Sequence, residues 1–186
     1  MSTHETVSEE RSSIAIREFY NEFSPPRYVL SLVARLLSSV PAKYTNGLDS
    51  VVLTNQSGAP RRDRVGKVTS RKRRVRQKGV LGRYHPSYGG RPAWIELYVD
   101  NLVVGVSYGR WVPLARTACF GHVLFHEIGH HVHATVRPEF REKEDVADDW
   151  GKKLLRNYVH EQYSYIPKWM LRLFGRILKM IAAELQ

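Results

Sequence analysis

The stretch LARTACFGHVLFHEIGHHVHA (residues 114–134) has the apolar spacing of a helix, and Pro113 before it suits a first turn. Inside it stands His126-Glu127-Ile128-Gly129-His130, with two histidines four residues apart. Residues at this spacing lie on one face of a helix, so both rings can reach a single ion. The stretch therefore predicts a helix with a metal-binding face.

Glu127 follows His126 directly and lies about 100° further round the predicted helix. It is therefore expected beside the ion and outside its set of ligands. From there its carboxylate can take a proton from water that the ion activates. A catalytic Zn²⁺ with three protein ligands keeps a fourth position for water, so a third ligand is expected from another part of the chain.

The third ligand is expected in the acidic run from Glu142 to Trp150, within a predicted helix over residues 139–158. Glu144 and Asp148 are four residues apart and share a face of that helix. Ala147 is small enough to let two helices approach. Glu144 is the first choice as ligand, whereas Asp148 is either a residue that orients a histidine or the ligand itself.

Together these two segments resemble the zinc metallopeptidases of the ImmA/IrrE type, over roughly residues 94–155. The residues that carry the resemblance are His126-Glu127-x-x-His130 and Glu144-x-x-Ala147-Asp148-x-Trp150-Gly151. Trp150-Gly151 stands where Phe-Ala is more usual, and the resemblance does not extend to the basic segment described below.

The resemblance implies a zincin-like fold, in which a small mixed or antiparallel sheet packs on the H-E-x-x-H helix. It implies one Zn²⁺ bound by His126, His130 and Glu144, with Glu127 as the general base. The implied activity is hydrolysis of peptide bonds in a protein substrate. Because the family is known for cleaving helix-turn-helix repressors, a transcriptional repressor is one candidate substrate.

The order of predicted elements gives the fold class. The expected elements are helices at 9–23 and 26–39, strands at 50–54, 79–84 and 92–102, and helices at 114–134, 139–158 and 168–185. Helices, then strands, then helices indicate an α+β protein. We expect a flexible tail at residues 1–12, one domain at 13–165 with a basic insertion at 58–79, and a C-terminal amphipathic helix at 166–186 that packs on the domain or on a partner.

The predicted strand at 92–102 has the clearest alternation in the chain, with apolar residues on one face. Trp94, Glu96 and Tyr98 lie on its other face. We expect this strand to form a sheet edge near the metal, where a peptide substrate can pair with it. A donor for the developing oxyanion is missing from the motif, and Tyr158, His160, Tyr163 and Tyr165 are all open choices.

The net charge of +11 is concentrated in one segment. Between Arg61 and Lys78 there are ten basic residues and one acid, Asp63, a local charge of +9. Three interpretations stay open: a flexible solvated loop or hairpin, a patch that contacts nucleic-acid phosphates, or a docking surface for an acidic protein. The patch would comprise Arg71, Lys72, Arg73, Arg74 and Arg76. No aromatic residue interleaves with these charges, so base stacking has little support.

Several classes of protein are excluded or disfavoured. A single cysteine, Cys119, excludes an internal disulfide and multi-cysteine zinc sites. The polar start of the chain does not have the pattern of a signal peptide, and no apolar run has the length of a membrane span. We expect a cytoplasmic protein. The alternative to an enzyme is a nucleic-acid-associated binding or regulatory protein on a zincin scaffold, with a metal that is structural or absent.

Overall fold

The computed structural model describes residues 14–56, 67–70, 73–76, 80–105, 112–136 and 143–166, with backbone alone for 67–70 and 73–76. The predicted tail at 1–12 and the predicted helix beyond Ile166 lie outside these ranges. The strands are β1 (Ala15–Phe19), β2 (Leu48–Thr54), β3 (Lys67–Ser70), β4 (Arg73–Arg76), β5 (Gly82–His85) and β6 (Ala93–Tyr98). The helices are α1 (Tyr28–Ser38), α3 (Val99–Gly105), α4 (Pro113–Thr135) and α5 (Lys143–Gln162), with a 3₁₀ turn at Ala42–Tyr44.

Four strands form a mixed sheet in the order β1-β2-β6-β5. The first three are parallel to one another, and β5 pairs antiparallel with β6. The predicted α+β class and mixed sheet are therefore confirmed. Strands β3 and β4 pair antiparallel with each other and form a separate two-stranded ribbon.

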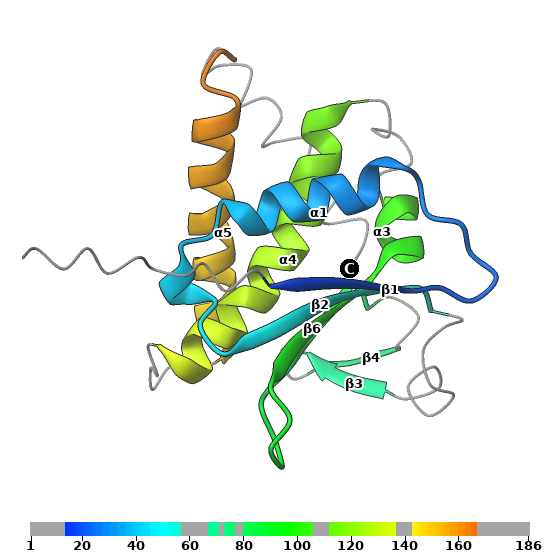
Figure 1. Ribbon diagram of the computed structural model, residues 1–186, viewed down its shortest axis with the longest axis vertical. Helices are drawn as coiled ribbons and strands as arrows, with labels where there is room; N and C mark the ends of the chain where they lie inside the picture. Colours follow the sequence, from blue (N-terminus) through cyan, green and yellow to red (C-terminus); the bar gives the residue numbers. More distant parts are fainter. Residues whose placement is uncertain are drawn as a thin grey trace, which may run out of the picture.

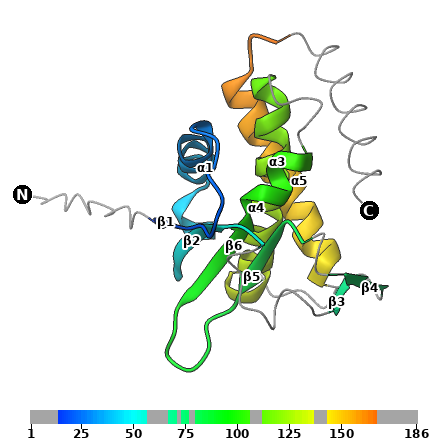
Figure 2. The same cartoon turned by 90° about the vertical axis from the view of Figure 1, so that its right-hand side faces the viewer.

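The helices build the layers that hold the site. Helix α4 packs against β5 and β6, and α5 packs along α4. Figure 1 shows α1 running across α4, with α5 beside α4, and Figure 2 shows the sheet from its side. The fully buried side chains of Phe120, Leu124 and Ile128 on α4 meet those of Ile95 and Leu97 on β6 in one apolar core. Burial of apolar surface is the main contribution that stabilises such a fold.

The predicted helix at residues 9–23 is wrong where the structure describes it, because Ala15–Phe19 is a strand. Ile16, Phe19, Tyr20 and Phe23 have helical spacing, but Phe19 is 63% exposed while Ile16 packs on the core. Pairing with β2 satisfies the backbone of this segment. Tertiary pairing thus overrides the local apolar period.

The predicted strand at 92–102 is wrong in its second half and in its place in the sheet. It ends at Tyr98, and Val99–Gly105 is helix α3, in which Val99 and Leu102 are buried at helical spacing. Strand β6 is also an interior strand, paired on one side with β2 and on the other with β5. Within the described residues the edge beside α4 is β5, because β6 already has hydrogen-bonding partners on both sides.

Candidate metal centre

Small residues hold α4 and α5 close together at the motif. A Cβ atom added to Gly129 would lie 2.6 Å from the backbone oxygen of Ala147, and one added to Gly151 would lie 3.1 Å from the backbone nitrogen of His126. Ala147 itself is fully buried. The predicted close approach of two helices at Ala147 is thereby confirmed, and it brings the acids of α5 to the histidines of α4.

His126, His130 and Glu144 converge on one point between the helices. The Nε2 atoms of the two histidines lie 3.1 Å apart. Glu144 places Oε2 3.4 Å from Nε2 of His126 and Oε1 3.8 Å from Nε2 of His130. All three side chains are partly exposed, at 18–31%, so the site can be reached from solvent.

These separations fit a tetrahedral zinc ion. Zn²⁺ binds histidine nitrogen and carboxylate oxygen at about 2.0–2.2 Å, and tetrahedral angles then place two ligand atoms about 3.4 Å apart. The two histidine nitrogens are 3.1 Å apart, and they lie 3.4 and 3.8 Å from different oxygens of Glu144, so each separation is close to that value. One ligand atom from each of the three residues lies within 4.8 Å of the other two. Two imidazoles and one carboxylate also match the ligand type of a catalytic zinc site. The residues therefore form a group that could hold a metal ion.

Asp148 lies behind His126 instead of among the ligand atoms. Its Oδ1 is 2.9 Å from Nδ1 of His126, the ring nitrogen that faces away from the centre. A carboxylate in this place accepts the Nδ1–H proton, fixes the orientation of the ring and leaves Nε2 for the ion. Of the two roles open to Asp148 in the sequence, the geometry supports the orienting one.

The charges at the centre shift the pKa values of the two histidines in opposite directions. Burial acts to lower the pKa of His126, but hydrogen bonds with Asp148 and Glu144 outweigh it and raise that pKa to about 10. Burial and the neighbouring charge of His126 lower the pKa of His130. The hydrogen bond with His126 lowers the pKa of Glu144. In the absence of an ion, the acids thus keep His126 in its protonated, positively charged form, while His130 stays neutral.

Glu127 is buried at the junction of α4 and β5, with 7% of its surface exposed. Burial raises the pKa of its carboxyl to about 7, against the opposing effects of His126 and of a hydrogen bond from the backbone N–H of Tyr84. Strand β5 comes this close because position 82 is glycine. A Cβ atom there would lie 2.7 Å from Cγ1 of Val123 and 3.1 Å from Oε1 of Glu127.

Tyr84 is a residue of the site that the sequence did not indicate. Its hydroxyl donates to Nδ1 of His131 at 3.1 Å, while Nε2 of that fully buried histidine donates to the backbone oxygen of Asn46 at 2.9 Å. The ring of Tyr84 lies nearly parallel to that of His130, with centroids 6.5 Å apart. These contacts depend on how β5 packs against α4, and they cannot be read from the sequence because Tyr84 is more than forty residues away from both histidines.

Trp94, Glu96 and Tyr98 do not join the metal ligands. They alternate with the core residues of β6 and lie on the sheet face opposite α4. There Tyr98 donates its hydroxyl to Oε2 of Glu96 at 3.0 Å, and His85 lies 3.3 Å from the same oxygen and stacks on Trp94 at 3.8 Å. The prediction that these three residues border a substrate edge is wrong, because β6 is an interior strand.

Two of the tyrosines considered as oxyanion donors pack away from the centre. Tyr158 is 3% exposed and contacts the ring of Phe125, with centroids 6.3 Å apart. The hydroxyl of Tyr163 lies 2.9 Å from Oγ1 of Thr117, near the start of α4. Thr117 precedes His126 by nine residues, which is about 14 Å along a helix.

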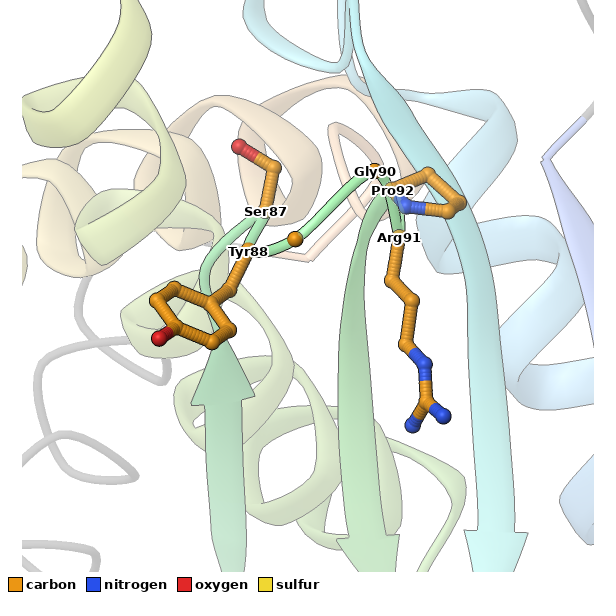
Figure 3. Close-up of a pocket in the computed structure, with 6 residues that line it drawn as sticks. Ser87, Tyr88, Gly90, Arg91 and Pro92 are labelled. Atoms are coloured by element: carbon orange, nitrogen blue, oxygen red, sulfur yellow. The ribbon is translucent and has the colours of Figure 1, made fainter.

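A surface hollow of about 490 Å³ lies elsewhere, at the turn between β5 and β6 (Figure 3). It is lined by residues 87–92 alone, which include no histidine and no acid. Gly89 and Gly90 have φ of +57° and +77°, as a tight two-residue hairpin turn requires. The hollow is a feature of this turn and contains none of the metal-ligand candidates.

Of the predicted basic patch, Arg71 and Lys72 lie outside the described residues, whereas Arg73, Arg74 and Arg76 belong to β4. None of the described helices is both long enough and apolar enough to cross a membrane. Comparisons of the chain with protein-family models, with curated proteins and with solved structures found no match. The metal centre therefore rests on the geometry of its own residues.

Proposed function

We propose that this chain is a zinc-dependent metallopeptidase of the ImmA/IrrE type that hydrolyses peptide bonds of a protein substrate. The observation that carries the proposal is the convergence of His126, His130 and Glu144. Buried Glu127 follows His126 in α4, and its pKa responds to the charges of His126 and Glu144. Zn²⁺ bound by that group would supply a Lewis acid that activates water and polarises a carbonyl. Two imidazoles, a ligating carboxylate and a separate carboxylate base form the set of groups that this chemistry needs.

The role of Glu127 is to move a proton. A general base works best when its pKa lies near the operating pH, and burial raises the pKa of Glu127 to about 7. The hydrogen bond from the N–H of Tyr84 holds the carboxylate in one orientation. Glu127 takes a proton from the attacking water and delivers it to the amine that leaves when the peptide bond breaks.

The edge strand β5 gives a place for the substrate backbone. It is antiparallel to β6 and lies directly over α4 at Gly82. The N–H of Tyr98 donates to the backbone oxygen of Leu81. Because hydrogen-bonded pairs alternate with non-bonded pairs along antiparallel strands, the backbone groups of Gly82 and Tyr84 are directed away from β6. An extended peptide can add to such an edge as a further strand. The N–H of Tyr84 already donates to Glu127, so the peptide would pair with the other outward backbone groups of Gly82 and Tyr84. This pairing would bring a peptide bond near Glu127.

The first test is metal content. The purified full-length chain should hold about one zinc ion per molecule, and His126→Ala and Glu144→Ala should remove it. Glu127→Gln should keep the metal and abolish hydrolysis, whereas Glu161→Gln, at an exposed position of α5, should change neither. A chain that binds no stoichiometric zinc would exclude the zinc-enzyme function.

The second test identifies the substrate. Proteomes of cells that carry the wild type or Glu127→Gln should differ in one or a few proteins that are cleaved only by the wild type. A transcriptional repressor among them would agree with the type of peptidase proposed. Cleavage of the same protein by Glu127→Gln at the rate of the wild type would show that Glu127 is not the base.

A further inference from the structure

The ribbon of β3 and β4 carries an unusual charge. Four of its eight residues are basic and none is acidic: Lys67, Arg73, Arg74 and Arg76. In the described residues these strands pair with each other and with no strand of the four-stranded sheet. Figures 1 and 2 show the pair beyond the sheet, away from α1.

The register of the ribbon places like charges together. Lys67 lies directly opposite Arg76, and Thr69 lies opposite Arg74. Like charges directly opposite each other on an antiparallel pair are destabilising, and an isolated two-stranded hairpin is only marginally stable. A ligand that brings negative charge to the ribbon would therefore stabilise this register.

The same register sorts the residues into two faces. Residues alternate between faces along a strand, and directly paired residues share a face. Lys67, Thr69, Arg74 and Arg76 therefore share one face, which we call the cationic face, whereas Val68, Ser70, Arg73 and Val75 share the other. Three cations and one hydroxyl are the residue types that contact phosphate oxygens of nucleic acids.

We infer that this ribbon binds the phosphate backbone of duplex DNA through its cationic face. A two-stranded β-ribbon fits the major groove of B-DNA, and four residues of strand span about 13 Å. Along that length the duplex carries about eight phosphates. Few other ligands present negative charge at that density, and release of the condensed counterions of DNA adds to the affinity.

The same residues disfavour single-stranded nucleic acid and duplex RNA. Binding of single strands relies on aromatic side chains on which bases stack, and the segment from Arg61 to Lys78 has no aromatic residue. The major groove of duplex RNA is too narrow for protein side chains to read. This inference does not depend on the metal centre, because none of its residues belongs to α4 or α5.

The test is a salt titration of binding by the full-length chain to a fluorescent 20-bp DNA duplex between about 50 and 200 mM salt. Lys67→Ser, Arg74→Ser and Arg76→Ser together should weaken binding. They should also make the slope of log K against log salt shallower by about 2.7, since each lost phosphate contact removes about 0.9. The matched control combines Arg27→Ser, Lys152→Ser and Arg156→Ser, which remove three exposed cations elsewhere and should change the slope by less than about 0.9.

Three results would overturn the inference. They are equal slopes for the cationic-face variant and the control, binding of single-stranded DNA as tight as that of the duplex, and equally tight binding of poly-glutamate at the same salt. The last of these would assign the ribbon to an acidic protein partner. Circular dichroism and zinc content should be the same in all variants, so a failure here is distinguishable from a failure of the proposed peptidase function.

Discussion

Asp148 Oδ1 lies 2.9 Å from His126 Nδ1, on the side of the imidazole opposite the nitrogen that faces Glu144. Helix α5 thus contacts both nitrogens of one ring through two acids that are four residues apart. The first acid points at the metal centre and the second fixes the ring from behind. The orientation of His126 is therefore set by α5, although His126 belongs to α4.

Asp148→Asn should weaken zinc binding without removing it. The amide keeps the shape of the side chain but loses the charge that orients His126 and raises its basicity. Loss of such a partner reduces metal affinity by about 10–100-fold. Competition with a chelator measures the change, and Asp145→Asn, at an exposed position of the same helix, should leave the affinity within about threefold of the wild type. Equal affinities for the two variants would contradict the orienting role.

Zinc affinity should rise with pH. The pKa of His126 is raised to about 10 in the absence of an ion, so at lower pH zinc must displace a proton from this ring. The pKa of His130 is lowered, so that ring adds no competing proton at neutral pH. The apparent affinity should then increase about tenfold per pH unit between about pH 7 and 9. A pH-independent affinity measured with a chelator over that range would contradict this arrangement.

The same shift has a consequence for the metal-free chain. A raised pKa of His126 stabilises the folded state fully below the unfolded value of 6.5. The contribution is lost as pH rises toward about 10. Urea titrations of the chelator-treated protein should therefore show this contribution falling with pH across that window, and Asp148→Asn should reduce the fall.

Gly129→Ala should destabilise the fold although alanine is the better helix former. The added methyl group meets the backbone of Ala147 at 2.6 Å, and backbone cannot rotate away. Overpacking of this kind costs about 1–3 kcal/mol in the free energy of unfolding. Gly121→Ala on the same helix is the control, because its nearest neighbour is Cδ1 of Leu155 at 3.0 Å, which is the end of a side chain. Thermal unfolding should show a lower Tm for Gly129→Ala than for Gly121→Ala.

Gly82→Ala should reduce hydrolysis while zinc stays bound. The added methyl group would meet Cγ1 of Val123 at 2.7 Å and lie 3.1 Å from Cγ and Oε1 of Glu127. The strand would have to shift from α4, which would separate the carboxylate from the N–H of Tyr84. Misplacement of a catalytic group by about 1 Å can reduce the rate by about 10²-fold. His126, His130 and Glu144 are untouched, so zinc content should equal that of the wild type. Unchanged kcat/KM would show that β5 does not position Glu127.

Tyr84→Phe should destabilise the protein through a residue outside the metal ligands. Removal of the hydroxyl leaves Nδ1 of fully buried His131 without the partner that lies 3.1 Å away. A buried polar atom left unsatisfied costs about 1–3 kcal/mol. Tyr88→Phe, at a position that is 87% exposed, is the matched control and should leave the unfolding midpoint in urea unchanged.

The metal centre could be predicted because its residues follow local periodicity. His126 and His130 lie one turn apart on α4, and Glu144 and Asp148 lie one turn apart on α5, so each pair is fixed by the geometry of a single helix. Sequence spacing could not say which ring nitrogen Asp148 faces. That depends on how far apart the helices lie, which Gly129 and Gly151 determine.

The sheet was less predictable because its strands pair over long separations. Ile16 and Phe19 have helical spacing, and only the distant β2 makes their segment a strand. The alternation in β6 was clear, but alternation does not tell an interior strand from an edge strand. Strand β5 has four half-buried residues, and its importance comes from contact with α4. Tyr84 could not be predicted as a residue of the site, because its contacts with His130 and His131 also depend on the packing of β5 on α4.

A sequence pattern written H-E-x-x-H treats two of its five positions as free. In this chain neither is free. Ile128 is completely enclosed by the core, and Gly129 faces a backbone that leaves no room for any other side chain. Sequences that share this packing of α4 on α5 should therefore be recognised better by a search for a bulky aliphatic residue and a glycine between the acid and the second histidine than by the spacing of the ligands alone.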